Sequence, residues 1–349
     1  MKKKIGFLVV CSLMLAATLS ADDPAQYGPW SAAVDLGSIV NSTANDQAPV
    51  ISPDGLSLYF GSQRPGGFGG VDIYVSQRAS ADGPWGPPQN LGPTINTPYT
   101  DNGPVLSHDG HRLFFQSTRP GGAGGQDLYV SRRHNKRDDF GWRTAENLGS
   151  GVNSFADEVK PEYFEDDATG VTYLYFRSNR PGGLGDSDIY VSTLQPDETF
   201  GPAVLVEEFS SIYGDFSVTL RRDGLEAIVS SNRNDLGKVG GSDLWVLSRA
   251  STADTWSSPT NLGADVNSPS EEVAATLSFD GTALYFFSNR PGTFGGFDLY
   301  VSTRTKLKGH GHGQDGDDND GRHDDGRHDD GRHNDGQHDD GHDDGHDDE

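Results

Sequence analysis

Cysteine is almost absent from this chain, and so are long apolar runs and any excess of basic residues. The one cysteine, Cys11, lies in the apolar stretch that follows three lysines at the start of the sequence. Without a second cysteine no disulfide can form within the chain, so the core must rely on packing and hydrogen bonds. The 52 acidic residues outnumber the 27 basic ones and give a net charge of −25. This charge excludes nucleic acid as an expected partner, because phosphate binding needs a basic face.

The first 21 residues differ in composition from the rest of the chain. Three lysines, an apolar run and small residues near Ser20 and Ala21 have the form of a secretory signal peptide. The apolar run is shorter than the roughly 20 residues that a membrane-spanning helix needs, and no later segment qualifies. We therefore expect an exported protein, periplasmic or secreted, without a transmembrane segment.

The opposite end, residues 305–349, is predicted to be a disordered acidic tail. From His310 onward it contains no apolar residue, so nothing there offsets the entropy of ordering the chain. Residues 310–349 hold 16 acidic residues and three arginines, and so −13 of the total charge. They also hold eight of the eleven histidines, and imidazole with carboxylate suits Zn²⁺, Ni²⁺ or Cu²⁺. The tail either binds such a metal or only solvates the protein, and the candidate ligands are His323, His328, His333, His338, His342 and His346.

Between these ends one pattern recurs five times. Its clearest part, "FGSQRPGGFGGVDIYVS" at residues 60–76, returns as "FQSTRPGGAGGQDLYVS", "FRSNRPGGLGDSDIYVS" and "FSNRPGTFGGFDLYVS", with a looser copy at residues 229–248. The aspartate that opens the last run recurs every 55 residues, except for one interval of 61. Each unit contains four strand-like pieces separated by "DG" turns or by the glycine-rich loop. No helical periodicity occurs between residues 27 and 304.

Repeated four-stranded units of this length predict an all-β fold, a five-bladed β-propeller over residues 27–304. Both faces of runs such as "LYF" are apolar, as expected for a sheet between two others. The last unit lacks its outer strand, whereas the N-terminal segment 30–36 supplies one. We therefore predict that this segment pairs into the last blade and closes the ring. The repeats are expected at about 46–91, 101–148, 158–206, 215–262 and 272–304.

The unit "SPDG…LYF.S.R…G..DIYVS" resembles the TolB-like, WD40-like β-propeller repeat, or PD40 repeat, of bacterial exported proteins. The resemblance covers nearly the whole core. It implies a propeller with a binding surface, since such repeats occur in binding and scaffold modules and in accessory domains of enzymes. A fold alone does not specify a reaction.

One acidic position and one arginine position recur in all five units. The acidic residues precede each innermost strand and are expected to surround one mouth of the central channel: Asp46, Asp101, Glu158, Asp215 and Glu272. Several convergent carboxylates suit a cation such as Ca²⁺ or a polar ligand; the alternative is that each caps a turn. The arginines are Arg64, Arg119, Arg180, Arg233 and Arg290. They either pair with the carboxylates or form an anion or sugar site.

The fourth unit departs most from the pattern, through functional specialisation or through drift. If it holds a specific site, the expected residues are Tyr213, Asp215, Arg233 and Lys238. The five repeated carboxylates are symmetric copies, whereas catalysis needs carboxylates in unlike environments. We therefore expect a monomeric, non-catalytic binding or scaffold protein that requires no cofactor and recognises a protein or glycan on its loop face. The alternative is a five-bladed glycoside hydrolase, which would use two or three carboxylates at the channel mouth.

Overall fold

The computed structural model describes residues 26–235 and 237–307. These residues form five antiparallel sheets of four strands and no helix, which confirms the predicted five-bladed β-propeller. The predicted signal peptide and nearly all of the predicted tail, including its six candidate metal ligands, lie outside the described residues. Within the described part, no helix is long and apolar enough to cross a membrane.

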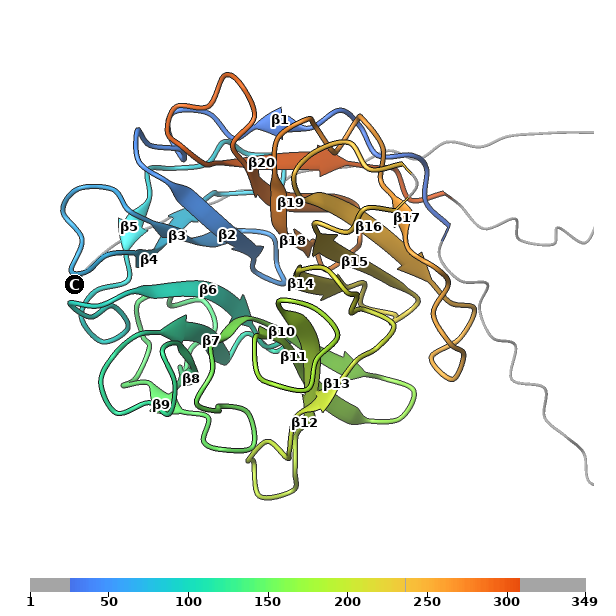
Figure 1. Ribbon diagram of the computed structural model, residues 1–349. Coiled ribbons are helices and arrows are strands. Elements are labelled where there is room, and N and C mark those ends of the chain that lie inside the picture. The colour runs from blue at the N-terminus through green and yellow to red at the C-terminus, as the bar shows by residue number, and fades with distance from the viewer. Residues whose placement is uncertain (1–25, 236, 308–349) are drawn as a thin grey trace, which may run out of the picture. The chain divides into compact units, whose positions relative to one another are not determined.

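Each blade contains an innermost, two middle and one short outer strand. The strands are β2 (Asp46–Ile51), β3 (Ser57–Ser62), β4 (Asp72–Gln77) and β5 (Gln89–Asn90); β6 (Asp101–Leu106), β7 (Arg112–Ser117), β8 (Asp127–Arg132) and β9 (Glu146–Asn147); β10 (Glu158–Asp166), β11 (Val171–Ser178), β12 (Asp188–Thr193) and β13 (Val204–Leu205); β14 (Asp215–Leu220), β15 (Glu226–Ser231), β16 (Asp243–Ser248) and β17 (Thr260–Asn261); and β18 (Glu272–Leu277), β19 (Ala283–Ser288), β20 (Asp298–Thr303) and β1 (Val34–Asp35). The innermost strands β2, β6, β10, β14 and β18 contact one another around a common axis (Figure 1).

The N-terminal segment closes the ring as predicted. Strand β1 pairs antiparallel with β20, with Val34 opposite Val301 and Asp35 opposite Tyr300. Pairing also continues past the predicted domain end, because Tyr27 and Lys306 form an isolated β-bridge. The first and last described segments are therefore joined by main-chain hydrogen bonds.

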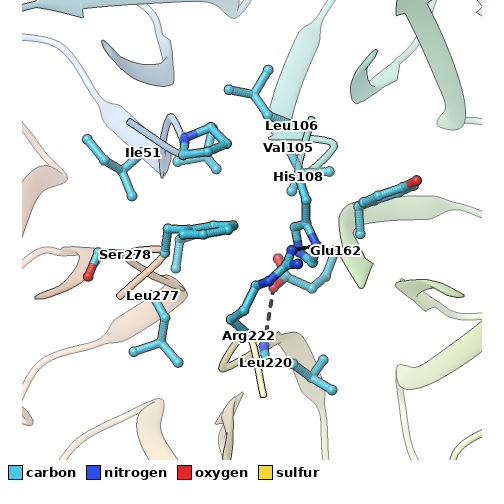
Figure 2. A pocket seen from close by; sticks show the side chains of 14 residues that line it. Ile51, Val105, Leu106, His108, Glu162, Leu220, Arg222, Leu277 and Ser278 are labelled. Carbon is cyan, nitrogen blue, oxygen red and sulfur yellow. Dashed lines mark hydrogen bonds between the residues drawn. The ribbon is translucent and has the colours of Figure 1, made fainter. Parts of the chain in front are cut away.

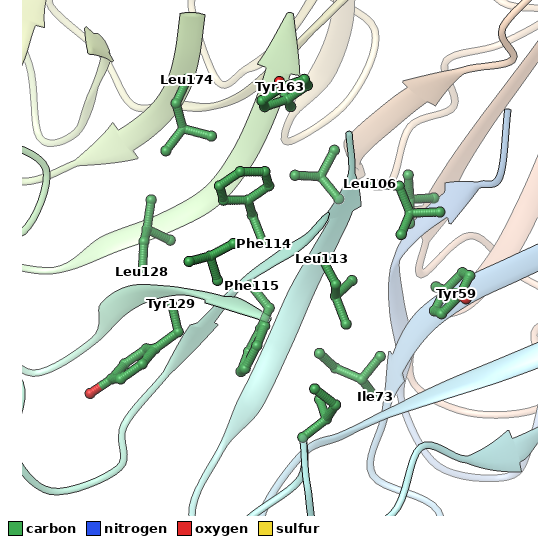
Figure 3. Packing of buried hydrophobic residues seen from close by; sticks show 14 of the residues in the cluster. Tyr59, Ile73, Leu106, Leu113, Phe114, Phe115, Leu128, Tyr129, Tyr163 and Leu174 are labelled. Carbon is green, nitrogen blue, oxygen red and sulfur yellow. The ribbon is translucent and has the colours of Figure 1, made fainter. Parts of the chain in front are cut away.

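The core lies between the blades, because each sheet is apolar on both faces. Leu58, Tyr59 and Phe60 on β3 are all completely buried, as expected for a sheet covered on each side. Between the second and third blades, the rings of Phe114 and Tyr163 stack with their centroids 5.3 Å apart. Figure 3 shows this contact among the buried residues around it.

The glycine-rich loop ties each blade to the next one. Gly66 has φ of +93°, which favours glycine. A Cβ atom on Gly69 would lie 1.7 Å from the carbonyl oxygen of Tyr99 in the following blade. Asp72 accepts hydrogen bonds from the amides of Phe68 and Gly69 and so fixes the loop from within. The repeated glycines therefore allow a close main-chain contact between blades.

Candidate functional site on the propeller axis

The five recurrent carboxylates are buried inside the blades. Asp101 is completely inaccessible; it accepts hydrogen bonds from Ser117 Oγ at 2.6 Å, from Arg119 Nη2 at 2.6 Å and from the amide of Thr97 at 2.6 Å. Its first oxygen thus binds the next strand of the same blade, and its second caps the preceding loop. The side chain points into the sheet. Asp101 therefore does not contribute to the expected ring of carboxylates around the channel mouth.

The same arrangement recurs in the other four blades. Each carboxylate is fully buried and accepts from the arginine of its own unit, at 2.8 Å for Asp46 and Arg64, 2.8 Å for Glu158 and Arg180, 2.7 Å for Asp215 and Arg233, and 3.0 Å for Glu272 and Arg290. Each pair neutralises both charges, and each arginine also donates to a main-chain carbonyl of the loop before its carboxylate. The described residues contain no group of three or more metal-ligating side chains.

The residue after each carboxylate faces the axis instead, because successive side chains of a strand point in opposite directions. Gln47, Asn102, Val159, Phe216 and Val273 line one pocket, together with Lys160 and Arg177. We call this the loop-side pocket, since it lies at the end of the innermost strands that follows the long loops. It has a mixed wall of amide, apolar and cationic groups.

Several polar atoms of the loop-side pocket lack a partner. The Nζ atom of Lys160 and the Oδ1 atom of Asn102 are buried without a hydrogen bond to any described residue. Burial lowers the pKa of Lys160 to about 8, although the nearby Glu162 counteracts this. Burial also lowers the pKa of Arg177, whose guanidinium lies 5.3 Å from the ring centre of Phe216.

The fourth-blade residues proposed from the sequence do not gather in one place around a cavity. The Nζ atom of Lys238 is exposed and donates to the carbonyl of Asn232 at 3.1 Å. Arg233 is almost fully buried with Asp215, and its Nε atom has no partner in the described chain. Tyr213 is half-buried and contributes its amide to a bond with Ser211 Oγ.

At the opposite end of the innermost strands a second pocket is lined by Glu162, Tyr163 and the turn residues Pro53, His108, Arg222 and Phe279. We call it the turn-side pocket. The turn residues occupy equivalent positions in four units, just before each "DG" pair, yet all four differ in chemistry. The loop-side framework is thus conserved among the repeats, whereas the turn side is varied.

Glu162 is the buried acid of the turn-side pocket. It accepts from Thr219 Oγ1 at 2.9 Å and from the amide of Leu220 at 3.2 Å, the contact that is dashed in Figure 2. Burial raises its pKa to about 7, although Lys160 and these two hydrogen bonds act in the opposite direction. Near neutral pH this carboxyl group can therefore exist in either protonation state.

His108 and Arg222 lie beside Glu162, as Figure 2 shows. His108 Nδ1 lies 2.6 Å from Arg222 Nη1 and 3.5 Å from a carboxylate oxygen of Glu165. Burial, followed by the charge of Arg222, lowers the pKa of His108. The imidazole is thus neutral at neutral pH and accepts from Arg222, which also pairs with Asp167 at 3.0 Å. Glu162 is thus the one acid on the pocket wall, and the more exposed Glu165 and Asp167 contact the wall residues His108 and Arg222.

Lys160, Glu162, His108 and Arg222 are not among the site residues predicted from the sequence. The third unit carries Lys160 and Glu162, whereas the other units have Ala, Gly or Ser at the first position and Val or Thr at the second. This departure from the repeat is the sequence feature that indicates the site, but the predicted site residues came mainly from the positions that all units share. The longer hairpin of the same unit supplies Glu165 and Asp167.

No family model and no curated protein matches this sequence, so the similarities found are to solved structures. An α-L-arabinofuranosidase from Lactobacillus brevis superposes with a TM-score of 0.51 at 16% identity over 77% of this chain and 92% of the other. The GH43_1 enzyme from Xanthomonas citri, complexed with xylose, gives 0.52 at 14% over 78% and 90%. The catalytic domain of a GH62 α-L-arabinofuranosidase from Coprinopsis cinerea gives 0.50 at 12% over 80% and 98%.

These matches correct the functional expectation. The solved propellers named above are glycoside hydrolases, which contradicts the non-catalytic binding or scaffold protein predicted from the TolB-like, WD40-like repeat. The prediction was wrong because it rested on the five recurrent carboxylates. These are symmetric copies, and they give no indication of acids in unlike environments elsewhere in the chain. At 12–16% identity the matches establish the shared five-bladed fold. They do not by themselves assign a reaction to this chain.

Proposed function

We propose that this protein is an exported glycoside hydrolase that acts through the acids of the turn-side pocket. The observation that supports this most directly is Glu162, a buried carboxyl group with its pKa raised to about 7 on the wall of that pocket. A glycosidase needs one acid that is still protonated near neutral pH and can protonate the leaving oxygen. Glu162 is suited to that role.

The second carboxylate in this proposal is Glu165, from the same strand. A glycosidase also needs an ionised carboxylate to act as base or nucleophile. Glu165 is partly exposed, lies near the His108 imidazole and accepts from Tyr163 Oη at 3.0 Å. Its environment differs from that of Glu162, which the symmetric carboxylates of the five blades could not offer each other.

The fold similarity supports the substrate class. The named structures are those of an enzyme complexed with xylose and of two α-L-arabinofuranosidases. We propose a pentose-containing glycan as the substrate, a monomeric enzyme, and export directed by residues 1–21. The lysines followed by an apolar run support export, and the acidic net charge supports a partner other than nucleic acid.

The proposal is tested by assaying the purified full chain on chromogenic α-L-arabinofuranoside and β-D-xyloside and on arabinoxylan. We expect turnover that falls by roughly 10²–10⁴-fold in Glu162→Gln, the usual contribution of a general acid. The control is Glu146→Gln, an exposed carboxylate that pairs with Arg132 away from the axis. Absence of turnover on every substrate, or equal rates for wild type and Glu162→Gln, would overturn the proposal.

A further inference from the structure

Two cations face the loop-side pocket without an anionic partner in the described structure. The Lys160 side chain is buried, and its Nζ atom has no hydrogen bond. Arg177 is partly buried, and its guanidinium lies over the ring of Phe216. Neither side chain is within 4 Å of a described carboxylate. Glu162 attracts Lys160, and Asp157 attracts Arg177, only from beyond this distance. The pocket therefore contains two cations that form no salt bridge with the described protein.

Such an arrangement is unusual for this protein. Buried arginines elsewhere, such as Arg133 and Arg233, pair with a carboxylate at 2.7 Å. A buried cation without a partner is unfavourable, since it has lost its hydration and gained no counterion. In a chain with 52 acidic residues, an unpaired cation pair in a pocket indicates a site that an external anion completes.

Lys160 is also held in an uncommon backbone conformation. Its φ is +49°, in the left-handed region, at the bulge where β10 shifts register against β11. Its amide donates to Gln116 Oε1 at 2.8 Å, which fixes the bulge across to the second blade. A lysine at this position is less favourable than the glycine of the second unit, Gly103, which has the same sign of φ.

The remaining walls of the pocket suit a small polar ring. Asn102 Oδ1 is buried and unpartnered in the described chain, so it can accept a hydrogen bond from a hydroxyl group. The chain makes room for this amide with Gly61, since a Cβ atom there would lie 2.0 Å from Asn102 Oδ1. Phe216 and Phe287 supply aromatic surface, to which the apolar face of a sugar ring can pack.

We infer that the loop-side pocket binds an acidic sugar, with Lys160 and Arg177 pairing to its carboxylate and Asn102 accepting from a hydroxyl group. A planar guanidinium matches a carboxylate through two parallel hydrogen bonds. The aromatic and amide walls distinguish a uronic acid from a bare inorganic anion. This site is separate from the turn-side pocket, so it does not depend on the proposed hydrolysis.

The test is titration calorimetry of the full chain with D-galacturonate and D-glucuronate, against D-galactose, D-glucose and inorganic phosphate as separate probes. We expect at least about tenfold tighter binding of a uronate than of its neutral sugar, because hydrogen bonds to charged groups are the stronger ones. Tighter binding of phosphate than of either uronate, or equal binding of uronate and neutral sugar, would overturn the inference.

Variants locate the site. Lys160→Met and Arg177→Met should each weaken uronate binding by about tenfold or more and leave binding of neutral sugar unchanged. Arg137→Gln, an exposed arginine outside the pocket, should bind uronate like wild type. Unchanged uronate affinity in Arg177→Met would contradict the inference even if Lys160→Met fails to fold. Glu162→Gln should keep uronate binding, so loss of hydrolysis and loss of this site can be distinguished.

Discussion

Lys160 and Glu162 lie two residues apart on β10, are both buried near the axis, and form no ion pair within 4 Å. Glu162 instead accepts from Thr219 and Leu220, whereas Lys160 Nζ has no hydrogen-bond partner in the described structure. Burial raises the pKa of Glu162 to about 7 and lowers the pKa of Lys160 to about 8. Both groups therefore change charge close to neutral pH.

The first prediction concerns stability. The pKa of Glu162 rises on folding from an ordinary value of 4.5 to about 7, so the folded state holds this proton more tightly. The resulting stability is fully present below about pH 4.5 and is lost as pH rises through about 7. Glu162→Gln remains neutral and should remove this loss. Urea unfolding between about pH 5 and 7.5 should show a steeper decline for wild type than for Glu162→Gln, and parallel curves would contradict the assignment.

The second prediction concerns the pH dependence of hydrolysis. If Glu162 protonates the leaving oxygen, kcat/KM should decrease above about pH 7, where the buried carboxyl group loses its proton. Initial rates on the best chromogenic substrate, measured from about pH 5 to 9, test this. Glu146→Gln should keep the wild-type profile. A rate that stays constant through pH 8 in wild type would exclude Glu162 as the proton donor.

The third prediction compares a buried pair with an exposed one. Arg119→Met leaves Asp101 completely buried without its cation, which should lower the free energy of unfolding by about 3–5 kcal/mol. Arg132→Met removes a pair with Glu146 whose side chains are 37% and 71% exposed; it should cost about 0–1 kcal/mol. Urea unfolding of both variants measures the difference. Equal losses would show that the repeated pairs have little structural importance.

The repeat allowed the architecture to be predicted, because period, strand order and the missing outer strand are all visible in the sequence. The pairing of the N-terminal segment with the last blade follows from that reasoning, whereas its register, with Val34 opposite Val301, comes from the structure. The direction in which the recurrent carboxylates point could not be predicted from the repeat. It depends on the face of the innermost strand from which each side chain projects. Asp101 binds Ser117 and Arg119 within its blade, whereas the next residue, Asn102, faces the pocket.

The candidate sites could not be predicted from the shared positions. Lys160, Glu162 and His108 each occur in only one unit, and their meeting depends on the ring that brings distant blades together. His108 and Arg222 are 114 residues apart in the sequence but 2.6 Å apart in space. These residues become visible when the five units are compared for differences at the positions that face the axis.

The fourth prediction concerns Asp139, which joins the first two blades. Burial raises its pKa, but hydrogen bonds from Ser57, Tyr59, Arg133 and Gln77 outweigh this effect and the pKa lies below its usual value. Its stabilising contribution is therefore present above the unfolded pKa of about 3.8 and is lost as pH falls through the lower folded value.

Asp139→Asn should accordingly lower the free energy of unfolding at pH 7 by about 3–5 kcal/mol, because Arg133 is left buried without its counterion. The difference from wild type should shrink as the pH is lowered below about 4. Asp138→Asn, at the exposed neighbouring position, is the control. Urea unfolding at several pH values measures both, and a loss independent of pH would contradict the role of the charge.

The last prediction concerns ring closure. Asn41 donates to the carbonyl of Leu299 at 3.1 Å and accepts from the amide of Leu299 at 2.9 Å, so it joins the beginning of the chain to β20. Asn153 makes the same two bonds with Leu128 on β8 inside the ring. Alanine at either position leaves one buried main-chain amide unpaired, at about 1–3 kcal/mol, because the carbonyls of Leu299 and Leu128 still accept from the amides of Leu36 and Leu148.

The two variants should differ in where the structure opens. In Asn41→Ala, β1 should separate more readily from β20, because only non-covalent contacts join the segment before β2 to the last blade, and the β20 amides should exchange hydrogen faster. The exposed strand edge should also promote association at high protein concentration. In Asn153→Ala, faster exchange should be confined to β8, since the chain continues on both sides of it. Hydrogen exchange measured by mass spectrometry distinguishes these outcomes, and unchanged protection of β20 in Asn41→Ala would show that closure depends on other contacts.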